Sequence, residues 1–162
     1  MNSVASGRPQ VTAYVALGAN LGDTVKTLHW AINALAQLPQ TQLLVRSSLY
    51  LTAPVDSHGP DYVNAVVALT TALTAPALLG QLQTLEHLAG RERPYLNAPR
   101  TLDLDLLLFG AATLQSATLV VPHPRMTQRA FVLLPLFEIA PLAVTSSQLQ
   151  AVQSQVVARL PC

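Results

Sequence analysis

The sequence has little cysteine, little charge and no long apolar run. One cysteine, Cys162, occurs among 162 residues, so no internal disulfide can form and a disulfide-stapled secreted fold is excluded. The apolar stretches are broken by proline, glycine or charge before they reach the ~20 residues that cross a bilayer, which argues against a transmembrane helix. We therefore expect a cytoplasmic protein that does not act on a membrane.

Residues 1–10 lack the apolar segment of a signal peptide and are expected to form a short disordered leader. Residues 11–162 are expected to form a single domain. A chain of this length with 51% hydrophobic content can bury roughly 70% of its unfolded surface, so it needs no disulfide or metal to hold it together.

Charged residues make up only 10% of the chain and the net charge is +1, which argues against a broad nucleic-acid surface. Lysine is almost absent, because eight of the nine basic residues are arginine. Five of these arginines fall between positions 91 and 129, and the planar guanidinium group suits phosphate oxygens. A GC-rich genome would explain the preference for arginine over lysine, but it would not explain this clustering.

Turn residues and hydrophobic periodicity predict the order strand, helix, strand, strand, helix, strand. The expected strands are Val11–Leu17, Gln42–Leu51, Tyr62–Leu73 and Arg100–Phe109, and the expected helices run from Asp23 or Thr24 to Pro39 and from Pro76 to Gly90. A hairpin over Phe109–Val121 and helices over Gln128–Ile139 and Gln148–Leu160 should follow. This order predicts an α+β fold, a ferredoxin-like sandwich with helices packed on one face of an antiparallel sheet, an added hairpin and C-terminal helices. The other sheet face is then left for a ligand.

Two carboxylates, Asp103 and Asp105, lie two residues apart in an otherwise apolar run. In a strand they share one face, about 7 Å apart along the chain, while the intervening leucines face the core. Charges ~5 Å apart would repel by about 3 kcal/mol at an effective dielectric constant near 20. A magnesium ion is the leading candidate to relieve this repulsion. The spacing alone does not separate this interpretation from two solvated acids on an edge strand.

Other polar residues have both a functional and a structural interpretation. Tyr62 and Asn64 share a face of their predicted strand, where a buried amide would recognise a heterocycle or satisfy a neighbouring loop. Gln83 and Glu86 lie three apart on one helix face, where such residues are more often solvated. His123 is either a ligand or an ordinary loop residue. No His/Cys set has zinc-ligand spacing.

Five segments resemble, in order, those of the 6-hydroxymethyl-7,8-dihydropterin pyrophosphokinase family. They are Gly18–Gly22, Asp61–Ala65, Pro99–Asp105, Val121–Phe131 and Pro135–Pro141. Members of this family transfer pyrophosphate from ATP to a pterin alcohol in folate biosynthesis and release AMP. The resemblance extends from about Thr12 to about Leu142 and implies the ferredoxin-like fold that the element order already predicts.

Residue by residue, the resemblance implies that Asp103 and Asp105 hold two magnesium ions. The residues implied to contact ATP are Gln83, Glu86, Arg91, Arg100, His123 and Arg129. Those implied to act in catalysis are Arg91, Arg100 and Asp105. The pterin would lie between Tyr62 and Phe131, with its edge read by Asn64 and by the backbone of Thr52, Ala53 and Val55. The partners implied are these two small molecules, with no nucleic acid, no membrane and a monomeric protein.

Two positions depart from the family pattern. This chain has Asn97 where a tryptophan is frequent, in a loop about one residue shorter than in some relatives, and Asp56 where a glycine is frequent. We expect these changes to affect rate more than reaction type. The loop Arg91–Pro99 has few apolar residues to anchor it, and a hypothesis is that it closes over the substrates as a lid.

Two rival functions stay open at this stage. A ferredoxin-like sheet can bind RNA through exposed aromatic residues, although the weak net charge and missing basic-aromatic pattern argue against it. A metal-dependent phosphohydrolase could use the same acids. The reaction product distinguishes these alternatives.

Overall fold

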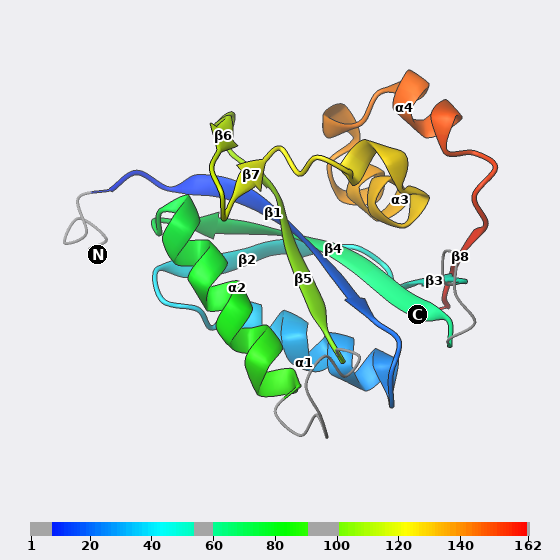
Figure 1. Cartoon of the computed structure of the whole chain (residues 1–162), viewed down its shortest axis with the longest axis horizontal. Helices are drawn as coiled ribbons and strands as arrows, with labels where there is room; N and C mark the ends of the chain where they lie inside the picture. Colours follow the sequence, from blue (N-terminus) through cyan, green and yellow to red (C-terminus); the bar gives the residue numbers. More distant parts are fainter. Residues whose placement is uncertain (1–7, 54–59, 91–100, 162) are drawn as a thin grey trace.

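The computed structural model describes residues 8–53, 60–90 and 101–161 of the chain. Within these ranges the main sheet has six strands, paired in the order β5-β1-β4-β3-β8, with β2 also paired to β4 (Figure 1). The strands are β1 (Val11–Ala19), β2 (Thr41–Arg46), β3 (Tyr50–Thr52), β4 (Tyr62–Thr71), β5 (Asp103–Phe109) and β8 (Val157–Arg159). All these pairings are antiparallel, and β5 is an edge strand. The predicted fold class is confirmed.

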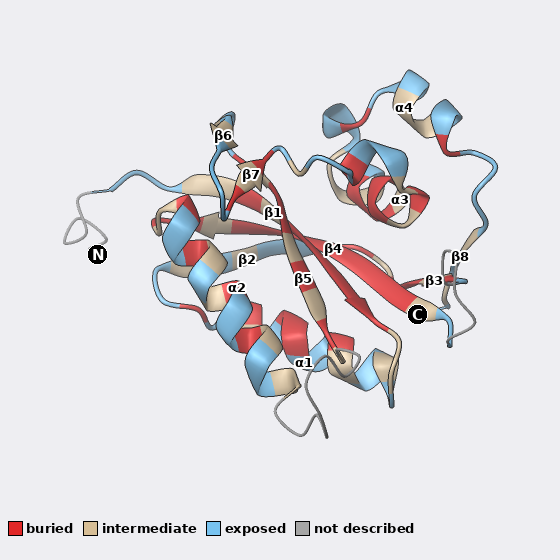
Figure 2. Cartoon of the chain, in the orientation of Figure 1, coloured by how far each residue is buried: buried red, intermediate tan, exposed pale blue. Residues whose placement is uncertain are grey.

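Two helices cover one face of the sheet and form the larger core with it. Helix α1 (Thr24–Ala36) begins after Asp23, whose side chain accepts a hydrogen bond from the Lys26 amide, and helix α2 (Ala75–Ala89) begins after Thr74 and ends at Gly90. Their buried leucines pack against alternate residues of β1, β4 and β5. Figure 2 shows buried residues along both helices and along these strands. Both helices were predicted from their spacing of apolar residues.

A second, smaller core lies on the opposite face of the sheet. Helix α3 (Ala130–Ile139) packs there against Ala16, Val66 and Leu107, together with Val152 from the turn that follows helix α4 (Ser146–Ala151). The face is therefore covered in part, and not left wholly free for a ligand. Strand alternation places Gly18, Asn64, Asp103 and Asp105 on this same face.

The predicted strand Gln42–Leu51 is wrong as one element, because the structure divides it into β2 and β3. Between them, Ser47 donates its backbone amide to the Val66 carbonyl at 2.9 Å, and its side-chain oxygen accepts from the Val66 amide at 2.9 Å. The serine hydroxyl thus replaces a backbone carbonyl in the ladder. The strand pairing stops there, and β3 begins afresh at the other half of β4.

The predicted helix Gln148–Leu160 is also wrong. Helix α4 ends at Ala151, Val152 enters the second core, and the chain turns and pairs as β8 with β3. The two valines Val156 and Val157 favour a strand over a helix. The decisive partner, β3, lies about 100 residues earlier in the sequence, so local periodicity carries no sign of it.

The remaining predictions agree more closely with the structure. The predicted hairpin contains β6 (Leu114–Gln115) and β7 (Val120–Val121), which pair with each other. Two short 3-10 helices, Met126–Gln128 and Pro141–Ala143, flank α3. Of the predicted leader, residues 1–7 lie outside the described residues, and the Arg8 side chain donates to the Ala72 carbonyl at 2.9 Å. In the described ranges, no helix has the length and apolar character needed to cross a bilayer.

Candidate functional site

Three residues, Asn64, Gly18 and Asp103, form a row across β4, β1 and β5 on the sheet face that α3 covers in part. Gly18 on β1 lies opposite Asp103 on β5 and opposite Asn64 on β4. Asn64 is buried, and its side-chain amide donates to the Thr52 hydroxyl at 3.1 Å. A Cβ atom on Gly18 would lie 2.9 Å from Asn64 Oδ1, so the glycine provides the space that Asn64 fills.

Sequence reasoning placed Gly18 in a turn after the first strand, but β1 continues through Gly18 to Ala19. A glycine inside an apolar run is the signal that could have revealed its place, because such glycines often mark the close approach of another group in a sheet.

The predicted pair Asn64 and Thr52 is brought together here. Tyr62 lies two residues before Asn64 on the same face, half-buried, and Ala53 is exposed.

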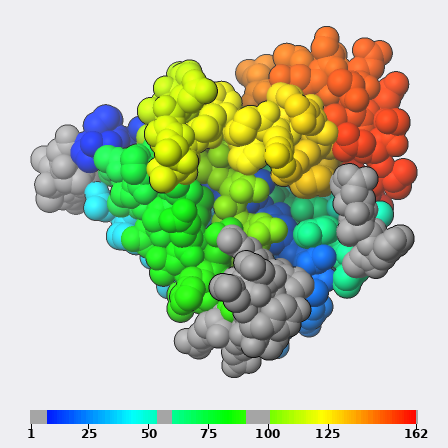
Figure 3. Space-filling model, in the orientation of Figure 1, coloured from blue at the N-terminus to red at the C-terminus, as the bar shows by residue number. Residues whose placement is uncertain are grey.

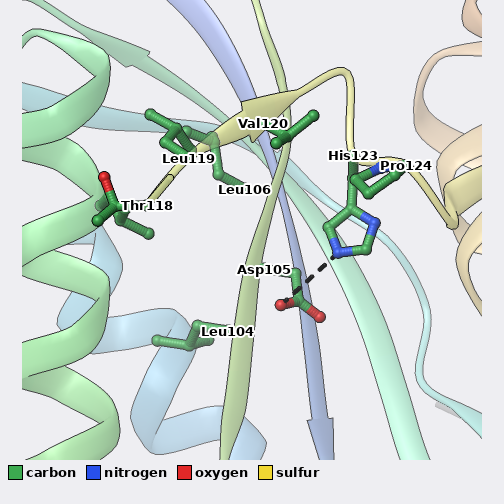
Figure 4. A pocket seen from close by; sticks show the side chains of 9 residues that line it. Leu104, Asp105, Leu106, Thr118, Leu119, Val120, His123 and Pro124 are labelled. Atoms are coloured by element: carbon green, nitrogen blue, oxygen red, sulfur yellow. Dashed lines mark ion pairs between the residues drawn. The ribbon is translucent and has the colours of Figure 1, made fainter. Parts of the chain in front are cut away.

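The two aspartates point from the edge strand β5 toward the same face. Asp105 lies opposite Ala16, and its side chain is 47% exposed. His123 Nε2 lies 4.0 Å from Asp105 Oδ1, and the two side chains point toward one another (Figure 4). The backbone amide of His123 donates to the Leu107 carbonyl at 2.9 Å, and this bond fixes the histidine beside the aspartate.

The protonation of His123 follows from its surroundings. Burial lowers the pKa of the imidazole, and the charges of Arg129 and Arg125 lower it further, while Asp105 acts to raise it; the balance lies below the usual value. The Arg125 backbone amide donates to Nδ1 at 3.1 Å. The neutral ring therefore carries its proton on Nε2, which faces Asp105 and the open side of the site.

Glu86 on α2 is tied to the strand of the aspartates. Its Oε2 accepts a hydrogen bond of 2.7 Å from the Leu104 backbone amide, between Asp103 and Asp105. A purely solvated role for Glu86 is therefore wrong, although contact with ATP stays a prediction. Gln83 lies on the same helix and is exposed.

A pocket of about 200 Å³ opens beside Asp105 at the edge of β5 (Figure 4). Leu79, Leu104, Leu106, Leu119, Val120 and Pro124 supply apolar walls, and Thr118, Asp105 and His123 supply polar groups. In the space-filling view, β5 is visible at the base of a hollow between α2 and the chain leading into α3 (Figure 3). Sequence reasoning missed the apolar lining from the hairpin, because its short strands carry no strong periodicity. Asp105 and His123 lie together on one side of this apolar lining (Figure 4), an arrangement that suits a flat ring that bears a charged tail.

The start of α3 carries the remaining predicted residues. The guanidinium carbon of Arg129 lies 5.6 Å from the centre of the Phe131 ring, a cation–π distance. Phe131 is half-buried, so part of its ring is open to a ligand.

Three predicted residues, Arg91, Arg100 and Val55, lie outside the described residues, as do the loop Arg91–Pro99 and both departures from the family pattern.

A polar cluster braces β3 against α3 near this site. The Glu138 carboxylate accepts hydrogen bonds from the Tyr50 hydroxyl at 2.7 Å, from the backbone and side chain of Ser48 at 3.0 Å, and from Arg159 at 3.0 Å. Burial and the bond to Glu138 raise the pKa of Tyr50 to about 12. Burial alone would raise the pKa of Glu138, but the hydrogen bonds from Tyr50 and Ser48 and the charge of Arg159 outweigh it and lower that pKa. Tyr50 is the β3 partner of Asn64, so the cluster supports the row described above.

Glu138→Gln should lower the free energy of unfolding at pH 7 by about 1–3 kcal/mol, because it leaves donors without their charged acceptor. The folded pKa of Glu138 is depressed, so its stabilisation is present above the usual value of 4.5 and is lost as the pH falls through the lower folded value. Urea unfolding from pH 7 to pH 3 should show the gap between the wild type and the variant closing at acidic pH. Asp61→Asn, at an exposed carboxylate, is the control and should show no gap. A gap that stays constant to pH 3 would contradict this account.

Three comparisons bear on this chain. A sequence model of a family described as 7,8-dihydro-6-hydroxymethylpterin-pyrophosphokinase (HPPK) matches residues 14–141. A 2-amino-4-hydroxy-6-hydroxymethyldihydropteridine pyrophosphokinase of Haemophilus influenzae is 45% identical over 141 residues, which cover 86% of this chain and 88% of the relative. One of the same name from Pseudomonas aeruginosa is 46% identical over 129 residues, covering 79% and 80%.

Solved structures show a similar fold. The crystal structure of wild-type Plasmodium falciparum HPPK-DHPS with pterin and p-hydroxybenzoate superposes with a TM-score of 0.64 at 14% identity. The match covers 83% of this chain, and this chain spans about 40% of the length of that longer protein. At this identity the likeness shows the fold alone.

Proposed function

This chain belongs to the 7,8-dihydro-6-hydroxymethylpterin-pyrophosphokinase family, and we propose that its reaction takes place on the polar sheet face around Asp103, Asp105 and Asn64. It is a diphosphokinase of folate biosynthesis that transfers pyrophosphate from ATP to 6-hydroxymethyl-7,8-dihydropterin. One observation carries this assignment: Asp103, Gly18 and Asn64 are consecutive positions across three neighbouring strands. A group that handles phosphate and a group that reads a heterocycle thus lie about 10 Å apart, two strand spacings, on one rigid surface.

The residues present fit magnesium. In the ranges that the structure describes, no group of three or more His, Cys, Asp or Glu side chains could hold a metal ion by itself. Mg²⁺ on a nucleotide uses one or two carboxylates together with phosphate oxygens and water, so a protein-only cage is not required. Asp103 and Asp105 would hold it, and we propose two ions. The bound metal would neutralise phosphate charge and align the reacting oxygens.

ATP is proposed to bind with its base in the apolar pocket and its phosphates toward Asp105. The pocket opens beside both Asp105 and His123, which fits a flat base with an anionic tail. The neutral His123 ring presents its Nε2 proton to a phosphate oxygen, and Arg129 supplies a positive charge. Gln83 and Glu86 lie on the neighbouring helix α2 as further proposed contacts.

The pterin is proposed to bind over Asn64. The amide, held by Thr52, reads the polar edge of the heterocycle, and Phe131 and Tyr62 supply stacking area. Ala53 and Val55 belong to the same proposed subsite.

The hydroxymethyl oxygen then attacks the β-phosphorus of ATP in line: the new oxygen–phosphorus bond forms, the bond to the bridging α,β-oxygen breaks, the hydroxyl proton is released and AMP leaves. Arg91 and Arg100 are proposed to meet the developing charge.

The reaction product tests this function. Purified protein with ATP and Mg²⁺ should release AMP only when 6-hydroxymethyl-7,8-dihydropterin is present, and equal amounts of AMP and pterin diphosphate should form. Release of ADP or phosphate without the pterin would instead support a phosphohydrolase. RNA binding without nucleotide turnover would support a binding module.

We also propose that the working unit is a single chain in the cytoplasm. The single cysteine fits a reducing compartment.

Phe131→Ala and Asn64→Ala should each weaken pterin binding far more than ATP binding. Loss of the stacking ring removes roughly 1 kcal/mol beyond buried area, and loss of the amide leaves a polar edge of the pterin unpaired at a cost of about 1–3 kcal/mol. Isothermal calorimetry with the pterin and with a non-hydrolysable ATP analogue, measured separately, checks this. Phe137→Ala, at an exposed phenylalanine on the same helix, is the matched control. Equal losses for both ligands would show that the subsites are assigned wrongly.

A further inference from the structure

The side chain of Gln155 spans the turn that leads into α3. Its Oε1 accepts from the Ala130 backbone amide at 2.9 Å, and its Nε2 donates to the Gln128 carbonyl at 2.9 Å. The two contacts need an acceptor on one side and a donor on the other, and the planar amide of glutamine supplies both. One side chain therefore holds the peptide groups on both sides of Arg129.

The start of α3 depends on this contact. Arg129 is the residue before the helix, and it makes no side-chain cap of its own. The first amides of a helix lack partners within the helix, and Gln155 supplies an acceptor for the first of them, the Ala130 amide. Because Gln155 lies in a distant segment, its contact also holds the first turn of α3 in a fixed position relative to that segment.

Gln155 is itself held in place. Its backbone amide donates to the Val152 carbonyl at 3.0 Å, and the amide of Val152 donates to the Leu149 carbonyl at 3.2 Å. Val152 is 3% exposed and packs in the same core as α3. The glutamine thus projects from a turn that is fixed against the helix it caps, although the residue is open to solvent.

Two proposed substrate contacts lie directly on the clamped turn. Arg129 is the clamped residue, and Phe131 follows two positions later with its ring 5.6 Å from the guanidinium carbon. A shift of this turn would move both groups together. The clamp comes from residues beyond 14–141, the part of the chain that the family model matches.

We propose that Gln155 is a positioning residue that sets the places of Arg129 and Phe131, and so couples the ATP subsite to the pterin subsite. The proposal rests on the proposed function, which assigns Arg129 to ATP and Phe131 to the pterin. It predicts that one substitution outside both subsites weakens both ligands, whereas Asn64→Ala weakens the pterin alone.

The test compares Gln155→Ala and Gln155→Glu with Gln153→Ala, which alters an exposed glutamine on the same turn. Dissociation constants for α,β-methylene-ATP with Mg²⁺ and for 6-hydroxymethylpterin are measured by calorimetry at a temperature where every variant is fully folded. Gln155→Ala should raise both constants about five- to tenfold, the effect of losing one to two net hydrogen bonds that hold the site. Gln155→Glu keeps the acceptor for Ala130 but sets a carboxylate oxygen against the Gln128 carbonyl, so its constants should rise at least as much as those of Gln155→Ala. Gln153→Ala should match the wild type.

A merely structural role predicts a different pattern. If Gln155→Ala lowers the melting temperature but leaves both dissociation constants unchanged, or if only one constant changes, the positioning role is wrong. Arg129→Ala and Phe131→Ala are measured alongside. If they weaken their own ligands while Gln155→Ala does not, this inference fails and the proposed site stands; if they have no effect, the proposed site fails as well.

Discussion

Asp105→Asn should reduce pyrophosphoryl transfer by about 100- to 1,000-fold, and Asp103→Asn should do the same. Each change removes one of two carboxylates that share a face of β5, and loss of one group that stabilises charge in a transition state typically costs that much in rate. The fold should survive, because asparagine has nearly the same shape and Asp105 is 47% exposed. For Asp105→Asn, removing one of two like charges should leave the melting temperature equal or slightly higher. Coupled detection of AMP release and a thermal melt measure the two effects.

Asp23→Asn is the control for these two variants. Asp23 is an exposed acid that caps α1, and asparagine caps helices about as well as aspartate does. Its rate and melting temperature should therefore match those of the wild type. A near-normal rate in either Asp103→Asn or Asp105→Asn would show that the metal is held elsewhere.

Gly18→Ala should weaken pterin binding by about 1–3 kcal/mol, which is about five- to 150-fold, and should destabilise the fold by a similar amount. The added methyl group would lie 2.9 Å from Asn64 Oδ1, and the buried Asn64 side chain cannot move aside without losing its bond to Thr52. Binding of an ATP analogue should change less, because the added methyl group would have, among the described residues, only Asn64 atoms within 4 Å, although Gly18 lies opposite Asp103. Calorimetry with each ligand and urea unfolding check this.

Two further variants separate this steric cause from a general loss of stability. Gly80→Ala makes the same change in α2 where nothing lies within 4 Å, and it should raise the free energy of unfolding by about 0.5–1 kcal/mol. In the double variant with Asn64→Ala the clash is gone, so the cost of Gly18→Ala should largely disappear. If the two costs simply add, the contact between Gly18 and Asn64 is not the cause.

The parts of the site that the sequence could predict depend on local periodicity. Asp103 and Asp105 occupy alternate positions in one strand, so their common face follows from strand geometry alone. Helix α2 has an N-terminal cap, a leucine face and a glycine stop that are all within its own segment. The candidate site residues came from the resemblance of short motifs, and the structure brings Asp105 beside His123 and Asn64 beside Thr52.

The parts that the sequence could not predict depend on partners far away in the chain. Ser47 ends β2 because its hydroxyl binds the Val66 amide, and β8 exists because β3 offers it an edge. Gln155 is one of several glutamines in a polar segment, and only the fold places its amide against the start of α3. Gly18 looks like part of a turn until its neighbour across the sheet is known.

The bond from Leu104 to Glu86 has a consequence for self-association. An edge strand presents free backbone groups to which a strand of another molecule can add, and proteins commonly prevent such aggregation with charge or with covering segments. On β5, Glu86 occupies the Leu104 amide, the His123 amide occupies the Leu107 carbonyl, and two aspartates stand on one face. The same acids that we assign to phosphate chemistry thus also protect the edge of β5 against strand addition. Variants that replace Glu86 or the aspartates with apolar residues would lose solubility together with activity.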